Sequence, residues 1–324
     1  MKNHQLLIGL FSFLGILILI VHSEVAFYAA SEALSLCLGS VIPSLFPFFI
    51  LSTLLTRSLS GVDFKILHPL ANLLKIPPGA QSILITGFLG GYPVGAKSIA
   101  DAHQYSGLSK PDAERMLAFC NNAGPAFIFG VVSAFFPEKR MVWMLWAIHV
   151  FSAILTGICF RVPIREHVTI RKNTISISAA LEHSLFVMAT VCGWIIVFKV
   201  ISNFLSLLLL NNLPCAAQTI AVGLLELTNG CFKLPAIDNI QIRFLICSGL
   251  LACGGLCVTM QTVSVAKNLS LQSYYKGKLL QTIFSILLSL LLIYKHWYVL
   301  ITIPGLIFLL VQQNNSGIKA SVSV

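Results

Sequence analysis

Long runs of hydrophobic residues alternate along the chain with short polar segments. About 20 helical residues cross the ~30 Å hydrocarbon core of a bilayer. Inside a bilayer the backbone must satisfy its own polar groups, which a helix does within one segment. The pattern therefore predicts an all-α polytopic membrane protein with about eight transmembrane helices. The predicted spans are residues 6–21, 33–56, 116–136, 141–160, 185–210, 243–265, 279–294 and 297–311.

Two further apolar stretches, 81–97 and 216–233, are interrupted by glycine, proline and polar residues. Lys and Arg gather in segments 57–75, 161–172 and 267–278, which the positive-inside rule places in the cytoplasm. The spans can then alternate only if stretch 81–97 enters and leaves from the cytoplasmic side. Stretch 216–233 must do so from the opposite side. Both are predicted to be re-entrant hairpins, and both termini are predicted to be cytoplasmic.

Each half of the chain consequently contains a span, a hairpin and two further spans, in this order, and the two halves have opposite orientations. This predicts one membrane domain, 1–324, built from inverted repeats at about 33–160 and 184–294, a frequent construction of secondary transporters. An offset of 136 residues aligns the two hairpins, with three of eleven positions identical: Gly87 with Gly223, Leu89 with Leu225, and Lys97 with Lys233. The first apolar run could also be a cleaved signal peptide. A retained first helix is the favoured interpretation.

Composition narrows the class of protein further. Hydrophobic residues make up 57% of the chain and charged residues 10%, against about 25% charged in soluble domains. The net charge of +10 is explained by loops that orient the helices, so no nucleic-acid partner is expected. The nine cysteines form no CxxC pair and no zinc spacing. We expect no metal, no cofactor and no enzymatic activity, because paired carboxylates, nucleophile–base pairs and nucleotide-binding motifs are also missing from the sequence.

The turn of the first hairpin is the first candidate site. Glycine and proline interrupt a helix, and irregular backbone at membrane depth survives where it is buried or lines a wet cavity. The alternative is that Gly91 and Gly95 form a close helix-packing face. The candidate solute-binding residues here are Gly90, Gly91, Tyr92, Pro93 and Lys97.

Asn121 and Asn122 precede Gly124 and Pro125 within the predicted span 116–136. This pattern predicts an interrupted span, in which Pro125 opens a new half-helix and an asparagine caps it. The two amides would then face the solute, or else form only an interhelical hydrogen bond. Gln261 and Thr259, below a Gly254-Gly255 break, occupy the corresponding place in the second half.

Glu226 follows an apolar run in the second hairpin and precedes Thr228 and Asn229. An acidic group at this depth indicates function by default. It could hold a coupling cation, carry a proton or accept hydrogen bonds from a solute. The alternative is a structural ion pair with Lys97 or Lys233. Lys199, the other deep charge, is interpreted as structural because its long stem can reach the interface.

Four segments together resemble a known family. They are PSLFPFF at 43–49, GGYPVGAK at 90–97, CNNAGPAFI at 120–128 and LELTNG at 225–230. They resemble the sporulation integral membrane proteins of the YlbJ type, which carry the nucleoside-recognition, or Gate, domain. The Gate-like region would cover about 43–136. That superfamily is similar in layout to the concentrative nucleoside transporters, although the first hairpin here has no carboxylate.

The resemblance implies a role in endospore formation and a site between two hairpins. We therefore expect a secondary carrier of a small polar, nucleoside-like solute in the inner, cytoplasmic membrane, with or without a coupling cation. The alternative is a scaffold that assembles the spore envelope through partner proteins. A carrier needs polar groups at mid-depth and short loops, which this chain has, so the carrier is favoured. Lipid is the surrounding partner, and a homo-oligomer is left open.

Overall fold

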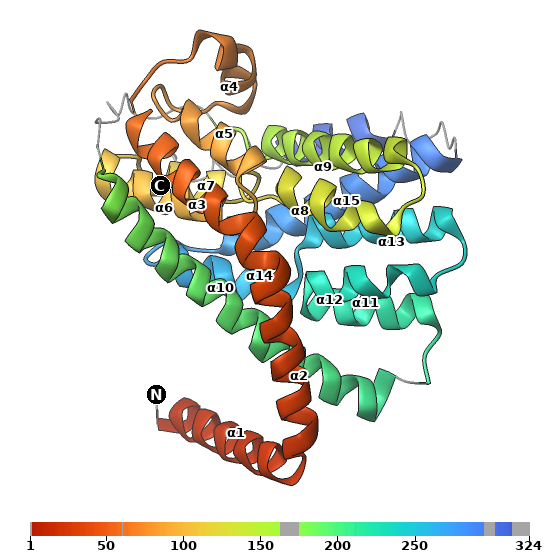
Figure 1. The fold of residues 1–324 in the computed structure, drawn as a ribbon. Helices are drawn as coiled ribbons and strands as arrows, with labels where there is room; N and C mark the ends of the chain where they lie inside the picture. Colours follow the sequence, from red (N-terminus) through yellow and green to blue (C-terminus); the bar gives the residue numbers. More distant parts are fainter. Residues whose placement is uncertain (1, 60, 163–174, 211, 295–301, 313–324) are drawn as a thin grey trace.

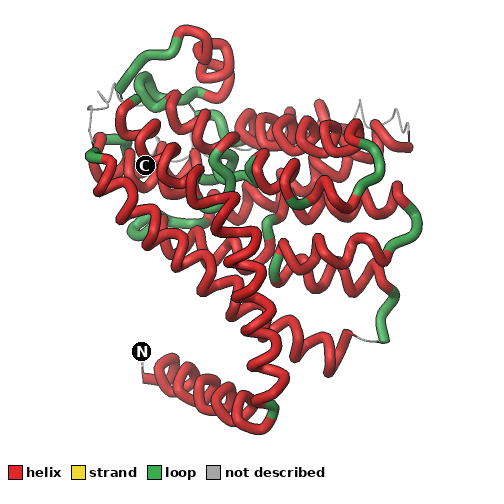
Figure 2. Tube along the Cα trace, in the orientation of Figure 1, coloured by secondary structure: helices red, strands yellow, loops and turns green. Residues whose placement is uncertain are grey.

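The chain folds into helices joined by short loops (Figures 1 and 2). The computed structural model describes residues 2–59, 61–162, 175–210, 212–294 and 302–312. No β-strand occurs within these described ranges. The all-α fold expected from the sequence is confirmed.

The first half of the chain begins with two consecutive apolar helices. α1 (Lys2–Val21) stands apart from the body of the molecule and packs against α2 (Figure 1). α2 (Ser23–Leu36) runs through a π-helical turn, η1 (Cys37–Val41), into α3 (Ile42–Ser58). This helix starts about ten residues earlier than predicted, because residues 23–32 contain no glycine or proline to end it.

The first hairpin consists of α5 (Gln81–Leu89) and α6 (Val94–Ser106), which pack against each other. An interrupted helical segment, in the place of the predicted span 116–136, follows it. α7 (Lys110–Met116) ends well before α8 (Pro125–Gly130), so the predicted break and the role of Pro125 in starting a new helix are confirmed. The remaining elements of this half are η2 (Lys65–Leu67), α4 (His68–Leu74), η3 (Val132–Phe135) and α9 (Lys139–Cys159).

The second half repeats this order of elements. α10 (Ile177–Leu205) leads to a hairpin of α11 (Cys215–Leu225) and α12 (Leu227–Lys233). α13 (Ile240–Cys253) and α14 (Gly255–Val265) are separated at Gly254, where φ is +77°, as the Gly254-Gly255 pair predicted. The remaining elements are η4 (Ser206–Leu210), η5 (Leu234–Ala236), α15 (Gln272–Tyr294) and the apolar helix Thr302–Gln312.

Corresponding helices of the two halves make corresponding contacts. α5 contacts α8 as α11 contacts α14, and α7 contacts α15 as α13 contacts α9. α9, α13 and α15 pack side by side, while α10 lies along α2 and α3 (Figure 1). These contacts fit a repeat of the same unit. The opposite orientation of the two halves in a membrane stays a prediction.

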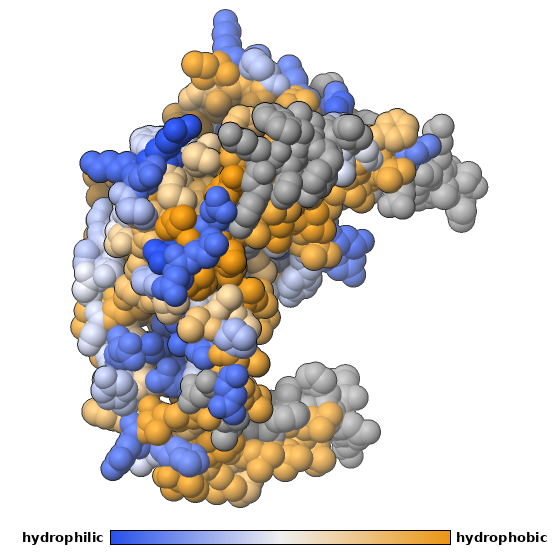
Figure 3. Space-filling view, turned by 90° about the vertical axis from the view of Figure 1, so that its right-hand side faces the viewer, coloured by the Kyte–Doolittle hydropathy of each residue, from blue (hydrophilic) through white to orange (hydrophobic). Residues whose placement is uncertain are grey.

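Five of the described helices are long and apolar enough to cross a membrane: Ser23–Leu55, Lys139–Cys159, Ile177–Leu205, Ile240–Val265 and Gln272–Ile293. By contrast, the 11 residues of α11 extend about 16 Å, far short of a bilayer core. The hairpins therefore cannot be pairs of full spans. Large apolar side chains are exposed on many helices, and they cover much of the face seen in Figure 3. The molecule is a polytopic helical membrane protein; the total of eight spans stays a prediction.

Part of the charged loop 161–172 and the start of the predicted span 297–311 lie outside the described residues.

Candidate functional site

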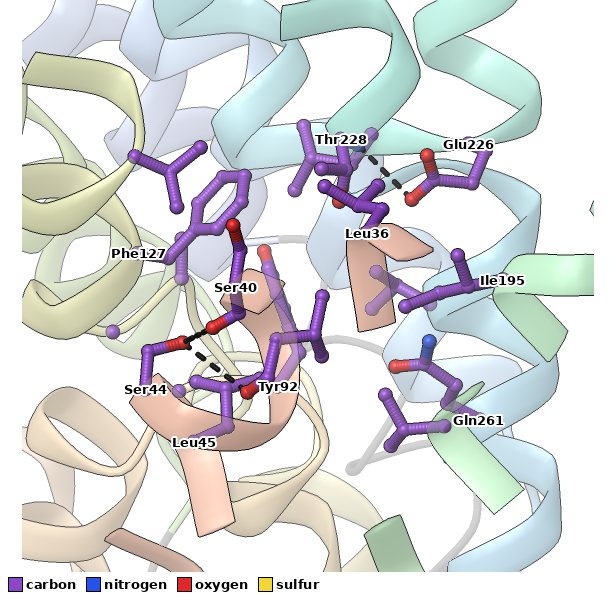
Figure 4. Close-up of a pocket in the computed structure, with 18 residues that line it drawn as sticks. Leu36, Ser40, Ser44, Leu45, Tyr92, Phe127, Ile195, Glu226, Thr228 and Gln261 are labelled. Atoms are coloured by element: carbon purple, nitrogen blue, oxygen red, sulfur yellow. Dashed lines mark hydrogen bonds between the residues drawn. The ribbon is translucent and has the colours of Figure 1, made fainter. Parts of the chain in front are cut away.

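A cavity of about 60 Å³ lies where the turns of both hairpins meet the π-helical turn η1 and both interrupted spans (Figure 4). This volume holds several water molecules. Four predicted site residues line it, namely Gly91, Tyr92, Glu226 and Thr228. The other lining residues are Leu36, Ser40, Val41, Ser44, Leu45, Ala123, Gly124, Phe127, Val131, Val191, Ile195, Leu227, Val258 and Gln261. The wall is thus mostly apolar and carries a few polar groups.

Glu226 is the acidic residue of this wall. It has extended backbone (φ −142°, ψ 115°) between α11 and α12, and its side chain caps α12. One carboxylate oxygen accepts a hydrogen bond from the Thr228 N–H at 3.0 Å and the other from the Asn229 N–H at 2.6 Å. A helix start favours a negative group there. The cap explains how a carboxylate that is only 2% exposed can be held at the cavity wall.

The alternative interpretation of Glu226, an ion pair with Lys97 or Lys233, is wrong. Lys97 instead pairs with Asp101 on its own helix at 2.6 Å, and Arg57 lies 3.6 Å from the same carboxylate. Within the described part of the chain, no ion pair involves Glu226. Lys97 lies away from the cavity wall, as do Gly90 and Pro93.

The turn of the first hairpin packs tightly against the interruption between α7 and α8. Gly91 has φ +79° and lies against Gly124. A side chain at Gly124 would collide with the backbone of Gly91, and one at Gly91 would be strained by the positive φ and tightly placed against Gly124. Gly95 lies directly against the backbone of Cys120. The interpretation of Gly91 and Gly95 as a packing face therefore has a geometric basis, while Gly91 also borders the cavity.

Asn121 and Asn122 are fully buried and point into the protein rather than lining the cavity. The Asn121 amide donates to the Thr262 hydroxyl at 2.9 Å. The Asn122 amide donates to the carbonyl oxygens of Phe119 at 2.7 Å and Gly87 at 3.3 Å. These bonds join hairpin, interruption and α14.

The predicted asparagine cap of α8 is wrong. Gly124 occupies the cap position, and no side chain caps the helix there. Pro125 at the helix start has no N–H that needs a partner. The freed N–H of Ala123 is instead bonded by the buried His149 of α9, whose Nε2 accepts it at 3.0 Å. His149 gave no signal in the sequence because it lies alone in an apolar helix.

Asn229 lies at the start of α12, off the cavity wall, and its side-chain oxygen accepts a bond from Lys199 Nζ at 3.3 Å. The same ammonium is 3.0 Å from the carboxylate of Glu32. Lys199 thus joins α10 to both α2 and the second hairpin. Lys199 therefore has a structural role, as interpreted from the sequence. It fulfils this role through an ion pair with Glu32, however, and not by extending its side chain to the membrane interface.

Sequence reasoning missed four further residues. Ser40 and Ser44 line the cavity because the π-helical turn places them there; Ser44 donates to the Ser40 carbonyl at 2.6 Å. Lys278 was assigned to a cytoplasmic loop, but it is only 5% exposed within α15. Gln281, one turn later, is fully buried and donates to Asn122. Its polar character within an apolar segment was the available signal.

Within the described residues, no group of three or more His, Cys, Asp or Glu side chains is arranged to hold a metal ion.

Fold and cavity together define an integral membrane protein with a mostly apolar pocket, carrying a few polar groups, between two helical hairpins. The chain is similar to the sporulation integral membrane protein YlbJ of Bacillus subtilis (strain 168). The two are 27% identical over 351 aligned positions, which cover 92% of this chain and 85% of the relative. The resemblance to YlbJ-type proteins read from the four segments is confirmed. No family model matches the chain, and no solved structure matches it.

Proposed function

We propose that the protein is a secondary carrier that moves a small polar solute across a membrane during sporulation by alternating access. The observation that carries this proposal is the cavity at the meeting point of both hairpins and both interrupted spans. Irregular backbone at membrane depth is tolerated where it is buried or lines a cavity. Carriers built from repeats bind their solutes at such a place.

The lining supports a solute with an apolar face and several hydrogen-bonding groups. Phe127 and Ile195 offer apolar surface, while Gln261 and Ser40 of η1 offer polar groups (Figure 4). Glu226 is available to accept hydrogen bonds from the solute or to hold a coupling cation. A nucleoside-like solute has this combination of a flat ring and hydroxyl groups, in line with the resemblance to the Gate superfamily.

The contacts of the two hairpins support a closed state on both sides. Asp101 of α6 in the first hairpin is held by Arg57 of α3. Asn229 of the second hairpin is held by Lys199, which also pairs with Glu32 of α2. In the proposed mechanism each hairpin moves in turn, and its own contact opens while the other stays closed.

The proposal is tested with purified protein in proteoliposomes. Uptake and binding are screened over a panel of nucleosides and small anions, with empty liposomes and heat-denatured protein as controls. Saturable uptake of one compound class supports a carrier. If the folded protein takes up no compound of the panel, yet a folded variant with an altered cavity, Gln261→Leu, still supports spore maturation in a sporulating host, the scaffold alternative is correct.

A further inference from the structure

Lys278 is a buried lysine. Its side chain lies in α15 and is 5% exposed. Its Nζ donates to the side-chain oxygen of Gln281 at 2.8 Å and to the hydroxyl of Tyr92 at 3.1 Å. It also lies 4.8 Å from the centre of the Tyr92 ring. Among the described residues no carboxylate forms an ion pair with it.

The ionisable groups around Lys278 come from the first hairpin turn, α9, α13 and its own helix, and none is a carboxylic acid. They are Tyr92 in the first hairpin turn, His149 of α9, Cys253 of α13 and Tyr274 of α15. α7 also packs against α15, but its carboxylates are bonded elsewhere, Asp112 to Arg115 and Glu114 to the Ser270 N–H. Burying a charge without a partner is strongly unfavourable, and such groups respond by changing their charge. Lysine does this readily when it is buried. An uncharged polar residue could form hydrogen bonds with Gln281 and Tyr92 at a lower desolvation cost.

The hydroxyl of Tyr92 connects this lysine to the cavity. Tyr92 lines the cavity and donates its own hydrogen to the Leu251 carbonyl of α13 at 2.9 Å. An ammonium group can only donate, so the Tyr92 oxygen must accept from Lys278 and its hydrogen is left for Leu251. A neutral amine has a lone pair that can accept this same hydrogen. Loss of the proton from Lys278 therefore allows Tyr92 to release Leu251.

Leu251 lies three residues before Gly254, at the break in the second interrupted span. The bond from Tyr92 thus joins the first hairpin to the interruption of the other half. The ammonium form of Lys278 enforces this bond, and the neutral amine permits its release. A proton on one nitrogen can in this way decide whether the two moving parts are joined at the cavity.

We propose that Lys278 is a proton-binding site whose protonation holds the first hairpin turn to α13 through Tyr92. The ligand is a proton, which comes from water and returns to water; no bond other than N–H forms or breaks. As a coupling device the site rests on the proposed carrier function, whereas proton binding itself does not. Lys278 acts on the cavity through Tyr92 and is a positioning residue rather than a solute ligand.

The test needs no solute. Thermal stability of the purified protein in detergent is measured from acidic to alkaline pH for wild type and Lys278→Met. The matched control is Lys276→Met, an exposed lysine on the same helix. We expect wild type and Lys276→Met to share a titration step that Lys278→Met lacks. Tyr92→Phe should keep the step but displace its midpoint, because the acceptor of the ammonium is gone.

Lys278→Arg keeps the experiment decisive if Lys278→Met fails to fold. Arginine keeps its charge at all accessible pH values, so this variant should fold without the step. An unchanged step in Lys278→Arg or Lys278→Met would overturn the proposal. This test and the uptake test can fail independently. An absence of solute uptake contradicts the proposed carrier function, whereas the proton site is tested by the titration step alone.

Discussion

The side-chain amide of Gln281 donates a hydrogen bond of 2.9 Å to the side-chain oxygen of Asn122, 159 positions away in the sequence. The bond joins α15, in the second half of the chain, to the interruption between α7 and α8 in the first. Both residues are buried, with exposures of 0% and 1%. Since the amide nitrogen of Asn122 is also bonded to two carbonyl oxygens, this side chain holds three parts of the fold together.

The first prediction concerns this amide. Asn122→Leu should lower the free energy of unfolding by about 1–3 kcal/mol, because the partners of a removed buried polar group are left unsatisfied. From the sequence alone, leucine would be expected to leave the fold intact, since it suits lipid. The measurement is thermal unfolding in detergent.

The control for Asn122 is its partner. Gln281→Leu and the double variant complete a mutant cycle. The double variant should lose less stability than the sum of the two single variants, since both partners of one bond are then apolar. If the stability losses of the two single variants simply add up in the double variant, the hydrogen bond is contradicted. Full stability of Asn122→Leu combined with lost activity would assign the residue to the solute site instead.

The second prediction concerns the packing of the first hairpin. Gly95→Ala places a methyl group against the backbone of Cys120, which cannot move aside as a flexible side chain can. We expect a destabilisation of about 1–3 kcal/mol, as for other overpacked cores. Gly193→Ala in α10 is the matched control, because nothing lies within 4 Å of the added carbon. Equal stability of the two variants would show that the hairpin does not pack this closely.

The third prediction concerns topology. Cys215, at the start of the second hairpin, is the exposed cysteine of the nine, all of which lie in the described part of the chain. If this hairpin enters from outside, a membrane-impermeant maleimide should label Cys215 in intact cells, and Cys215→Ser should abolish the labelling. Lys276→Cys in the Cys215→Ser background should react only after permeabilisation. Labelling of position 276 in intact cells would contradict the inverted repeat.

Local sequence was sufficient to predict where helices are interrupted. Pro125 has no backbone N–H to donate, and Gly254 and Gly255 both adopt positive φ. Both breaks occur as predicted. Glu226 was found because a carboxylate after an apolar run contrasts with its surroundings. In each case the signal depends on neighbouring residues of the chain.

Contacts between distant segments could not be predicted in this way. Glu32 and Lys199 are 167 positions apart, and charges scattered over two distant apolar helices do not reveal which of them pair. Lys278 looked like a loop residue because two other lysines precede it, yet α15 begins before it and buries it. The directions of the Asn121 and Asn122 side chains were open for the same reason. They depend on Thr262 and Gln281, which reach them only in the folded molecule.

The carrier account depends most on Glu226, which both caps α12 and faces the cavity. In Glu226→Gln one oxygen can still accept a backbone hydrogen bond, but the amide nitrogen cannot accept the other. The loss of one cap bond should reduce stability by about 0.5–2 kcal/mol. Asn239→Ala is the matched control, because Asn239 caps α13 through bonds from Gln241 and Ile242, is exposed and is not part of the cavity wall.

The most direct measurement compares thermal stability in detergent with solute uptake and spore maturation for wild type, Glu226→Gln and Asn239→Ala. The account predicts that both variants lose a similar small amount of stability. It also predicts that Glu226→Gln alone loses uptake and spore maturation. If Glu226→Gln keeps wild-type activity, or loses activity only in proportion to lost stability as Asn239→Ala does, Glu226 is part of the architecture and the proposed solute site is contradicted.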